Sequence, residues 1–184
     1  MTALPSFVQN LTKPTRYLSC AETAKLIRQA LKEAFPEIKF SVRSSVYSGG
    51  ASIRVNWNEG PTSDQVKAIA DAGFDGMQDL KTYKRKTLNG EPVSFGADYV
   101  FVGRDVPDAK IDAAAAILAK CENKNAMVNV AIRCGLEASL AFRLSDYSDT
   151  PSGYARYFLL NLPAPKFEGR TSKLADSITY LGED

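Results

Sequence analysis

The residues best suited to binding chemistry in this sequence lie on a predicted β-hairpin between residues 40 and 57. Polar and apolar side chains alternate on both sides of a Ser-Gly-Gly turn at 48–50, as expected for two paired strands. One face of this hairpin carries the polar set Arg43, Ser45, Tyr47, Ser52, Arg54 and Asn56. Arginine and tyrosine on an exposed face are suited to bind phosphate, carboxylate or a stacked base. The solvated face of an ordinary antiparallel sheet has the same pattern, so both interpretations stay open.

A short basic run forms a second candidate region. It extends from residue 81 to residue 86 and contains three lysines, one arginine and Tyr83. Such runs bind the phosphate backbone of nucleic acids, but lysines also protect the exposed edges of sheets. The candidate partner-binding residues of the two regions are Arg43, Tyr47, Arg54, Asn56, Tyr83, Lys84, Arg85 and Lys86.

Histidine is absent, and this absence excludes most common catalytic arrangements. Ser-His-Asp triads, Cys-His pairs and imidazole-based zinc sites all require it. The three cysteines, Cys20, Cys121 and Cys134, form no CxxC pair, and Cys20 has no histidine base to activate it. We therefore predict no catalytic residues, no metal site and no cofactor. A non-enzymatic protein is favoured, while an enzyme that uses Glu, Asp, Lys, Tyr or Arg stays open.

The composition is that of a globular chain with an ordinary core. Of 184 residues, 45% are hydrophobic and 24% are charged, and the formal net charge is +2. This balance excludes a highly acidic DNA mimic and does not support a strongly basic nucleic-acid binder, although a local basic patch is compatible with it. The chain has no run of about 18 apolar residues and no signal-peptide pattern. We expect a cytoplasmic protein with no membrane partner.

The periodicity predicts an α+β fold in which helices pack on one face of an antiparallel sheet. A helix is expected from Ser19 to Phe35, because Ser19 and Glu22 make a capping box and proline follows at 36. With the hairpin and a second helix over 62–72, it forms a helix–hairpin–helix N-terminal unit. The later expectations are a β region over 78–106, a helix over 107–121, a strand over 127–134, and helix or strand over 136–144 and 153–162.

Four parts are expected along the chain. They are an N-terminal arm (1–17), an α+β domain (18–106), a C-terminal elaboration that packs on the same core (107–165) and a tail (166–184). The arm and the tail are rich in Pro, Ser, Thr and Lys, which is typical of chain ends that add little to a core.

Three runs between residues 24 and 105 resemble a known family. They read AKLIRQALKEAFPEIKFSVRSSVYSGGASIRVNWNEGPT, FDGMQDL and GADYVFVGRDV. They are similar to the large polyvalent protein-associated domain of type 29, which occurs in proteins of phages and conjugative elements. The hairpin and the Gly-Pro-Thr after it are the most specific part of the resemblance. The family has no established catalytic residues, so none is transferred to this sequence.

The resemblance implies a mobile genetic element and the cytoplasm of its bacterial host. Polyvalent proteins enter the host with the element's DNA and blunt its early defences. By analogy, we predict a non-enzymatic protein that binds and inhibits a host nucleic-acid-targeting defence complex, of the anti-CRISPR or anti-restriction type. A few arginine and aromatic anchors would supply its affinity. The alternative is a DNA- or RNA-binding accessory protein of a phage or plasmid, in which the hairpin face and the basic run hold phosphates.

Overall fold

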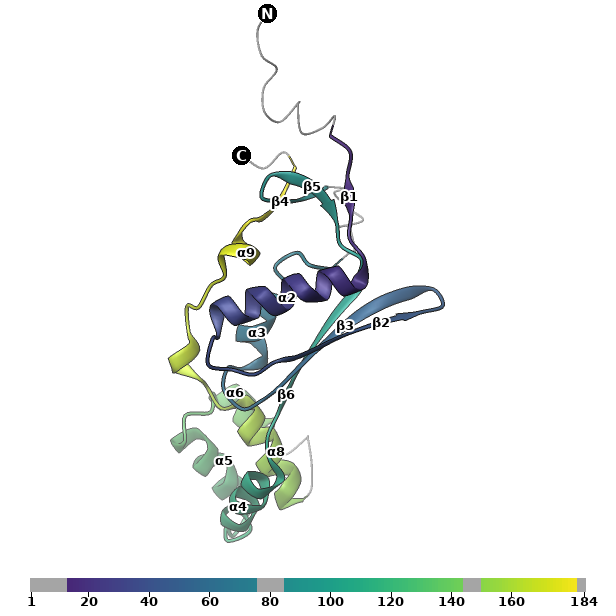
Figure 1. Ribbon diagram of the computed structural model, residues 1–184. Coiled ribbons are helices and arrows are strands. Elements are labelled where there is room, and N and C mark those ends of the chain that lie inside the picture. Colours follow the sequence, from purple (N-terminus) through teal and green to yellow (C-terminus); the bar gives the residue numbers. More distant parts are fainter. Residues whose placement is uncertain (1–12, 76–84, 144–149, 182–184) are drawn as a thin grey trace, which may run out of the picture. The chain divides into compact units, whose positions relative to one another are not determined.

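The computed structural model describes residues 13–75, 85–143 and 150–181 of the chain (Figure 1). The chain divides into two compact units. The first comprises residues 1–57, 63–103 and 169–184, and the second comprises residues 58–62 and 104–168. Each unit buries apolar side chains of its own, so each is described by itself.

Two β-sheets form the framework of the first unit. The four-stranded sheet has the order β1-β5-β4-β7, with β1 at Arg16–Tyr17, β5 at Glu91–Ser94, β4 at Lys86–Leu88 and β7 at Ile178–Tyr180. The three-stranded sheet has the order β2-β3-β6, with β2 at Ser41–Tyr47, β3 at Gly50–Asn58 and β6 at Tyr99–Asp105. Within the first of these sheets, β1 and β5 are parallel, whereas β4 pairs antiparallel with both of its neighbours.

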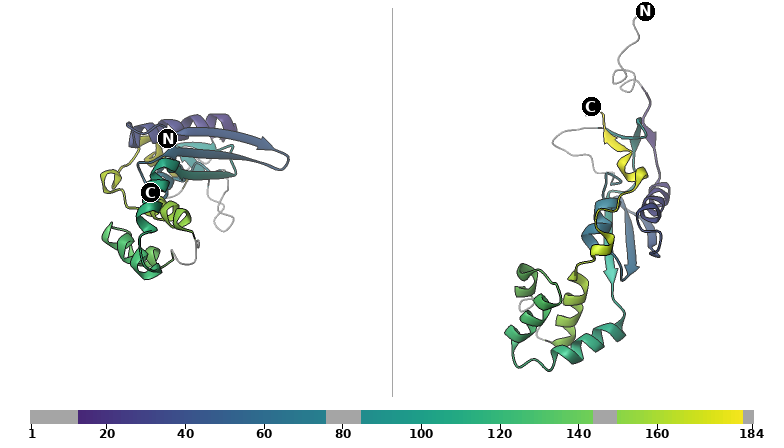
Figure 2. Two further views of the ribbon diagram at one scale, coloured as in Figure 1. Left: turned by 90° about the horizontal axis from the view of Figure 1, so that it is seen from below. Right: turned by 90° about the vertical axis from the view of Figure 1, so that its left-hand side faces the viewer.

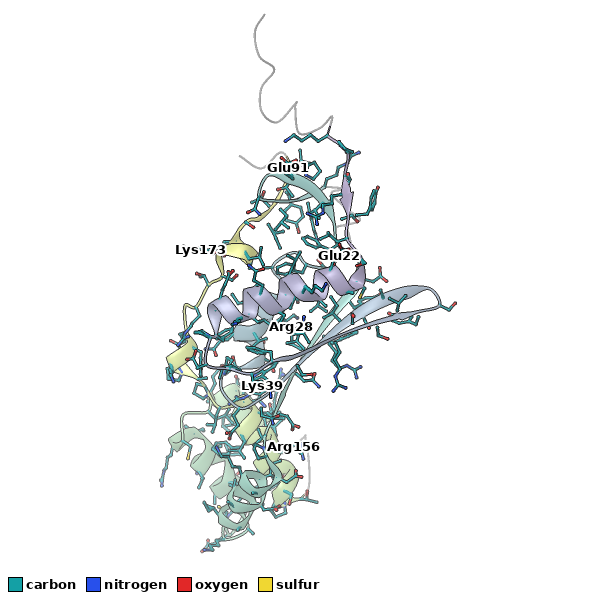
Figure 3. The ribbon with its side chains drawn as sticks, in the orientation of Figure 1. Glu22, Arg28, Lys39, Glu91, Arg156 and Lys173 are labelled. Carbon is teal, nitrogen blue, oxygen red and sulfur yellow. The ribbon has the colours of Figure 1, made fainter. Side chains whose placement is uncertain are left out.

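Helix α2 (Cys20–Ala34) begins at the predicted capping box. The Ser19 hydroxyl accepts from the amide of Glu22, and the Glu22 carboxylate accepts from the amide of Ser19 at 2.8 Å, so both amides at this end are satisfied. The helix packs its buried stripe against β2 and against α3 (Ser63–Ala70). From its other side, Arg28 donates to the carbonyl oxygen of Val42 in β2 at 2.8 Å (Figure 3).

The core between α2 and the three-stranded sheet is built from large side chains at the end of the helix and on β3. The ring of Phe40 lies 5.9 Å from that of Phe35 and 5.7 Å from that of Trp57, measured between centroids. Ile53 and Val55 alternate with exposed residues along β3 and are fully buried. The period of two that predicts the hairpin is therefore realised as one covered face and one open face.

The second unit is mainly helical. Its helices are α4 (Asp108–Leu118), α5 (Lys124–Arg133), α6 (Ala138–Phe142) and α8 (Pro151–Asn161), followed by the short 3₁₀ helix η1 (Pro165–Phe167). They enclose a cluster of buried residues from all four α-helices, with α4 packed along α8. This cluster shows that residues 107–165 form a core of their own. Their packing on the core of the preceding domain stays a prediction.

The expected strand over 127–134 is wrong, because these residues lie largely in α5. The Asn123 side chain accepts from the amide of Ala126 at 2.9 Å and so starts a helix just upstream. Val128 and Ala131, three residues apart, are the buried positions of that helix, and a short apolar run fits either period. The two ambiguous segments, 136–144 and 153–162, contribute the helices α6 and α8.

Residues 169–181 are held to the first unit and do not form a tail. The Arg170 guanidinium pairs with the carboxylate of Glu37 at 2.9 Å. The carboxylate of Glu33 in α2 accepts from the Ser172 hydroxyl at 2.8 Å and from the Leu174 amide at 3.2 Å, at the start of α9 (Lys173–Asp176). Strand β7 then completes the four-stranded sheet beside β4. The polar composition of this segment did not predict these contacts, because they join residues far apart in sequence.

The α+β class is confirmed, although the strands are divided between two sheets and include parallel pairs. Figure 2 shows α2 running along one side of the three-stranded sheet in both further views. None of the helices within the described residues is long and apolar enough to cross a membrane.

Candidate binding face

The register of the hairpin places the two arginines directly opposite each other. Arg43 in β2 faces Arg54 in β3, and the neighbouring pairs on the same side are Ser45 with Ser52 and Ser41 with Asn56. Both arginines and Asn56 are exposed, whereas Val55, their neighbour on the other side of β3, is buried. The structure therefore brings together the arginines predicted from the sequence, on the face turned away from α2.

Strand β6 extends this face by a third row of side chains. The Asp98 amide donates to the carbonyl of Ala51 at 2.8 Å, and Gly103 lies beside the Asn56 side chain, so the two strands run in the same direction. Because Gly103 lies beside Asn56, we infer that Phe101, two residues before Gly103, lies beside Arg54, two residues before Asn56. Arg43, Arg54 and Phe101 thus form one row across the sheet, with strands about 4.8 Å apart.

Tyr99 and Phe101 form an exposed aromatic pair on β6. Their rings stack with centroids 6.0 Å apart and planes inclined by 22°. Tyr99 is 48% exposed and Phe101 is 51% exposed, although aromatic side chains of this size usually gain free energy from burial. The open face is defined here as the side of β2, β3 and β6 that carries Ser41, Arg43, Ser45, Tyr47, Gly50, Ser52, Arg54, Asn56, Tyr99, Phe101 and Gly103.

The two arginines of the open face lack a carboxylate partner among the residues that the structure describes. Within the described residues, no carboxylate forms an ion pair with Arg43 or Arg54. Like charges directly opposite in an antiparallel pair are destabilising, so this arrangement works against folding stability. It also creates a local site where an anion would be bound by two guanidinium groups at once.

Three carboxylates lie near the aromatic pair. Asp71, Asp75 and Asp98 line a cavity of about 190 Å³ together with Tyr99, Val100 and Phe101. All three carboxylates have partners: Lys67 lies 3.7 Å from Asp71, Lys86 pairs with Asp75, and the Ala51 amide donates to Asp98 at 2.7 Å. Burial raises the pKa of the Asp71 carboxyl above its ordinary value. The open face therefore carries two arginines on β2 and β3, and carboxylate oxygens lie near its aromatic pair and beside Gly50.

The far end of the hairpin extends beyond the part covered by α2 (Figure 1). The thiol of Cys20, the first residue of α2, lies close to the carbonyl of Ser52 at 3.6 Å and marks where the helix meets the hairpin. Past this point Val46, on the same side of β2 as Val42, is 76% exposed. The alternation continues, but none of the described elements covers the inner face there. Tyr47, on the open face, is about half exposed.

Of the basic run at 81–86, the structure describes Arg85 and Lys86. Lys86 is only 6% exposed, because it lies on the central strand β4, and its amine donates to the carbonyl of Asp75 at 2.6 Å and pairs with that residue's carboxylate. The assignment of Lys86 as a partner-binding residue stays a prediction. Arg85 is exposed next to it. Tyr83 and Lys84 lie outside the described residues.

The cysteines offer no reactive centre among the described residues. Burial raises the pKa of the Cys20 thiol, which is the opposite of what activation at a helix start would do. Cys121 and Cys134 are free thiols, the first partly buried and the second exposed. No cluster of three metal-ligating side chains occurs in the part of the chain that the structure describes.

The aromatic pair is the part of the face that sequence reasoning missed. The run Tyr99-Val100-Phe101-Val102 is apolar on both sides of a strand, so its alternation cannot show which side is buried. The one available signal was that the aromatic and β-branched residues strictly alternate. The location of Phe101 beside Arg54 could not be predicted from the local sequence, because it depends on the pairing of β6 with β3. That pairing joins residues 47 apart in sequence.

Comparison with known proteins bears on the same part of the chain. Residues 18–107 match the family model of large polyvalent protein associated domain 29. The match covers β2, β3 and β6, and with them every residue of the open face. It ends as α4 begins, so the helical second unit lies almost wholly outside it. No curated protein and no solved structure shows significant similarity to the chain.

Proposed function

We propose that this protein binds nucleic acid through the open face, as an accessory protein of a mobile genetic element. The observation that carries the proposal is the opposed pair Arg43 and Arg54, without ion-pair partners among the described residues and in one row with Phe101. Phosphate groups are bound well by guanidinium forks, and bases are bound by exposed rings. The family's association with polyvalent proteins supports the mobile-element context.

The near-neutral net charge is compatible with this proposal, because the binding charge is local. The formal charge is +2 over the whole chain, yet Arg43 and Arg54 lie side by side on the open face, and the Asp98 carboxylate lies at its Gly50 end. Since each phosphate contact contributes separately to the salt dependence of affinity, two or three contacts predict modest binding that weakens in salt. Such a protein would bind nucleic acid with a short footprint.

Inhibition of a host defence complex stays a prediction. Arginine and tyrosine are common anchors of protein interfaces, so the open face also has the composition of such a surface. No feature of the described residues identifies a particular host complex, whereas the arginine row beside exposed rings specifically favours nucleic acid. A stable protein complex recovered from host lysate, in the absence of nucleic-acid binding, would favour inhibition of a host complex over nucleic-acid binding.

The proposal is tested by fluorescence anisotropy with labelled DNA and RNA of mixed sequence, about 20 nucleotides long, starting near 50 mM salt. The variant Arg43→Glu/Arg54→Glu should lose at least tenfold in affinity, and the slope of log affinity against log salt should fall by about 1.4. The control Lys120→Glu/Arg133→Glu changes the net charge equally, at exposed positions in the second unit, and should bind within about twofold of the unmodified protein.

Two outcomes would overturn the proposal. One is the absence of binding to every probe at low salt. The other is an equal loss of affinity in both charge variants, because the effect would then come from overall charge and not from the open face. Urea denaturation of each variant shows whether it is folded before its binding is measured.

A further inference from the structure

We infer that the ligand of the open face is a single-stranded nucleic acid whose unpaired bases stack on Tyr99 and Phe101. This inference rests on the proposed nucleic-acid binding and adds the class of substrate. It starts from the two rings, which lie on one strand two residues apart, half exposed and stacked on each other. A base has a free π-face for such a ring only where it is not paired and stacked within a duplex.

The charges around the pair separate a backbone side from a base side. Arg43 and Arg54 lie on β2 and β3, while Asp71 and Asp75 line a cavity together with the rings, and Asp98 accepts from the Ala51 amide at the start of β3. Carboxylates repel phosphates but accept hydrogen bonds from the amino groups of bases. One strand satisfies both sides, with its phosphates over the arginines and its bases over the rings. A duplex laid across the same face would bring a second phosphate backbone toward the carboxylates.

The width of the face agrees with a single strand. Three strands spaced about 4.8 Å apart place the outer rows about 10 Å from each other. That distance separates Arg43 from Phe101 in the row that they share with Arg54. It corresponds to the reach from a backbone phosphate across its sugar to a stacked base, so one nucleotide spans the row without any change in the sheet.

A competing arrangement uses the hairpin alone. Two-stranded ribbons enter the major groove of duplex DNA, and the hairpin of β2 and β3 extends beyond α2 with both arginines on one side (Figure 1). In that arrangement the rings on β6 contribute nothing, and duplex DNA binds at least as tightly as its separated strands. The two arrangements therefore differ in probe preference and in their dependence on Tyr99 and Phe101.

The decisive experiment compares three probes of one sequence: single-stranded DNA, its duplex, and an abasic strand that keeps the phosphates. We expect single-stranded DNA to bind at least about fivefold more tightly than either of the others, the range expected for loss of one or more stacked bases. The variant Tyr99→Leu/Phe101→Leu keeps apolar side chains that a strand tolerates and removes the rings. It should lose about fivefold or more for single strands only.

Tyr17→Leu is the matched control, because Tyr17 is 81% exposed on β1, in the other sheet of the first unit. It should leave single-strand affinity unchanged. Duplex binding equal to single-strand binding, or unchanged affinity of Tyr99→Leu/Phe101→Leu, would overturn the inference while the proposed nucleic-acid binding stands. Equal binding of the abasic strand would overturn it too. If no probe binds, the proposed function itself fails.

Discussion

The two faces of the β2-β3-β6 sheet are made by the same strands and have opposite chemistry. One face lies under α2 and buries Ile53, Val55 and Trp57. The other carries Arg43 and Arg54 face to face, next to two half-exposed rings on β6. Because strand residues alternate between faces, neighbours such as Trp57 and Asn56 belong to different environments. The covered face supplies stability, and the open face retains groups that lower stability and suit a ligand.

Stability and binding can therefore be changed separately in this sheet. A like-charge pair and exposed rings are unfavourable in the folded protein unless something binds them. The covered face offsets this cost by closing a core with the rings of Phe35, Phe40 and Trp57. Substitutions on the two faces should therefore produce different signatures, and the following four predictions are arranged from the largest effect to the smallest.

Trp57→Ala should have the largest effect on stability. It removes a buried ring in contact with Phe40, and we expect the free energy of unfolding to fall by about 3–5 kcal/mol. Urea denaturation followed by circular dichroism measures the change. Asn56→Ala, one residue earlier on the open face, should change it by less than about 0.5 kcal/mol. Equal losses from both substitutions would mean that the two faces do not differ in this way.

Lys86→Met should destabilise the protein, whereas Arg85→Met should not. The Lys86 amine is buried and bonded to both the carbonyl and the carboxylate of Asp75, so its loss should cost about 2 kcal/mol. Arg85 is exposed, and its replacement should stay within about 0.5 kcal/mol. The measurement is again the urea midpoint. A small effect at Lys86 would indicate that this lysine is available to a ligand after all.

Stability should fall in acid partly through Glu33, on α2. The hydroxyl of Ser172 and the amide of Leu174 hold the pKa of this carboxyl below its ordinary value. The folded protein therefore binds fewer protons here than the unfolded chain, and the stabilisation is complete above the unfolded pKa, about 4.3. It is lost as the pH falls through the lower folded pKa.

The difference in urea midpoint between the unmodified protein and Glu33→Gln should thus be larger at neutral pH than below about pH 4. Arg43→Gln and Arg54→Gln serve as comparisons from the open face. A difference for Glu33→Gln that does not depend on pH would show that the charge of the carboxylate is unimportant.

The smallest effect should have the opposite sign. Arg43→Thr relieves the like-charge pair and introduces a residue with high strand propensity, so we expect a gain of about 0.2–1 kcal/mol. The same variant should bind single-stranded DNA more weakly, which anisotropy measures. A loss of stability would mean that Arg43 makes favourable contacts in the free protein.

Local patterns predict much of the first unit, because its signals lie within a few residues. Ser19 and Glu22 form the predicted capping box, and the turn at 48–50 joins the predicted strands. The arginine face follows from the same alternation. Beyond residue 120 the apolar runs are short and fit the period of a helix or of a strand. The pattern therefore predicted a strand for the segment that forms α5.

The sequence by itself determined the helix and hairpin of the first unit, the α+β class, and an exposed pair of arginines, since each depends on neighbours along the chain. Tertiary structure alone decided which of the described basic residues are exposed to solvent and which side chains lie beside them. Burial of Lys86 depends on two strands that flank β4, and the place of Phe101 depends on the pairing of β6 with β3. Such contacts join distant segments, and no local pattern of residues records them.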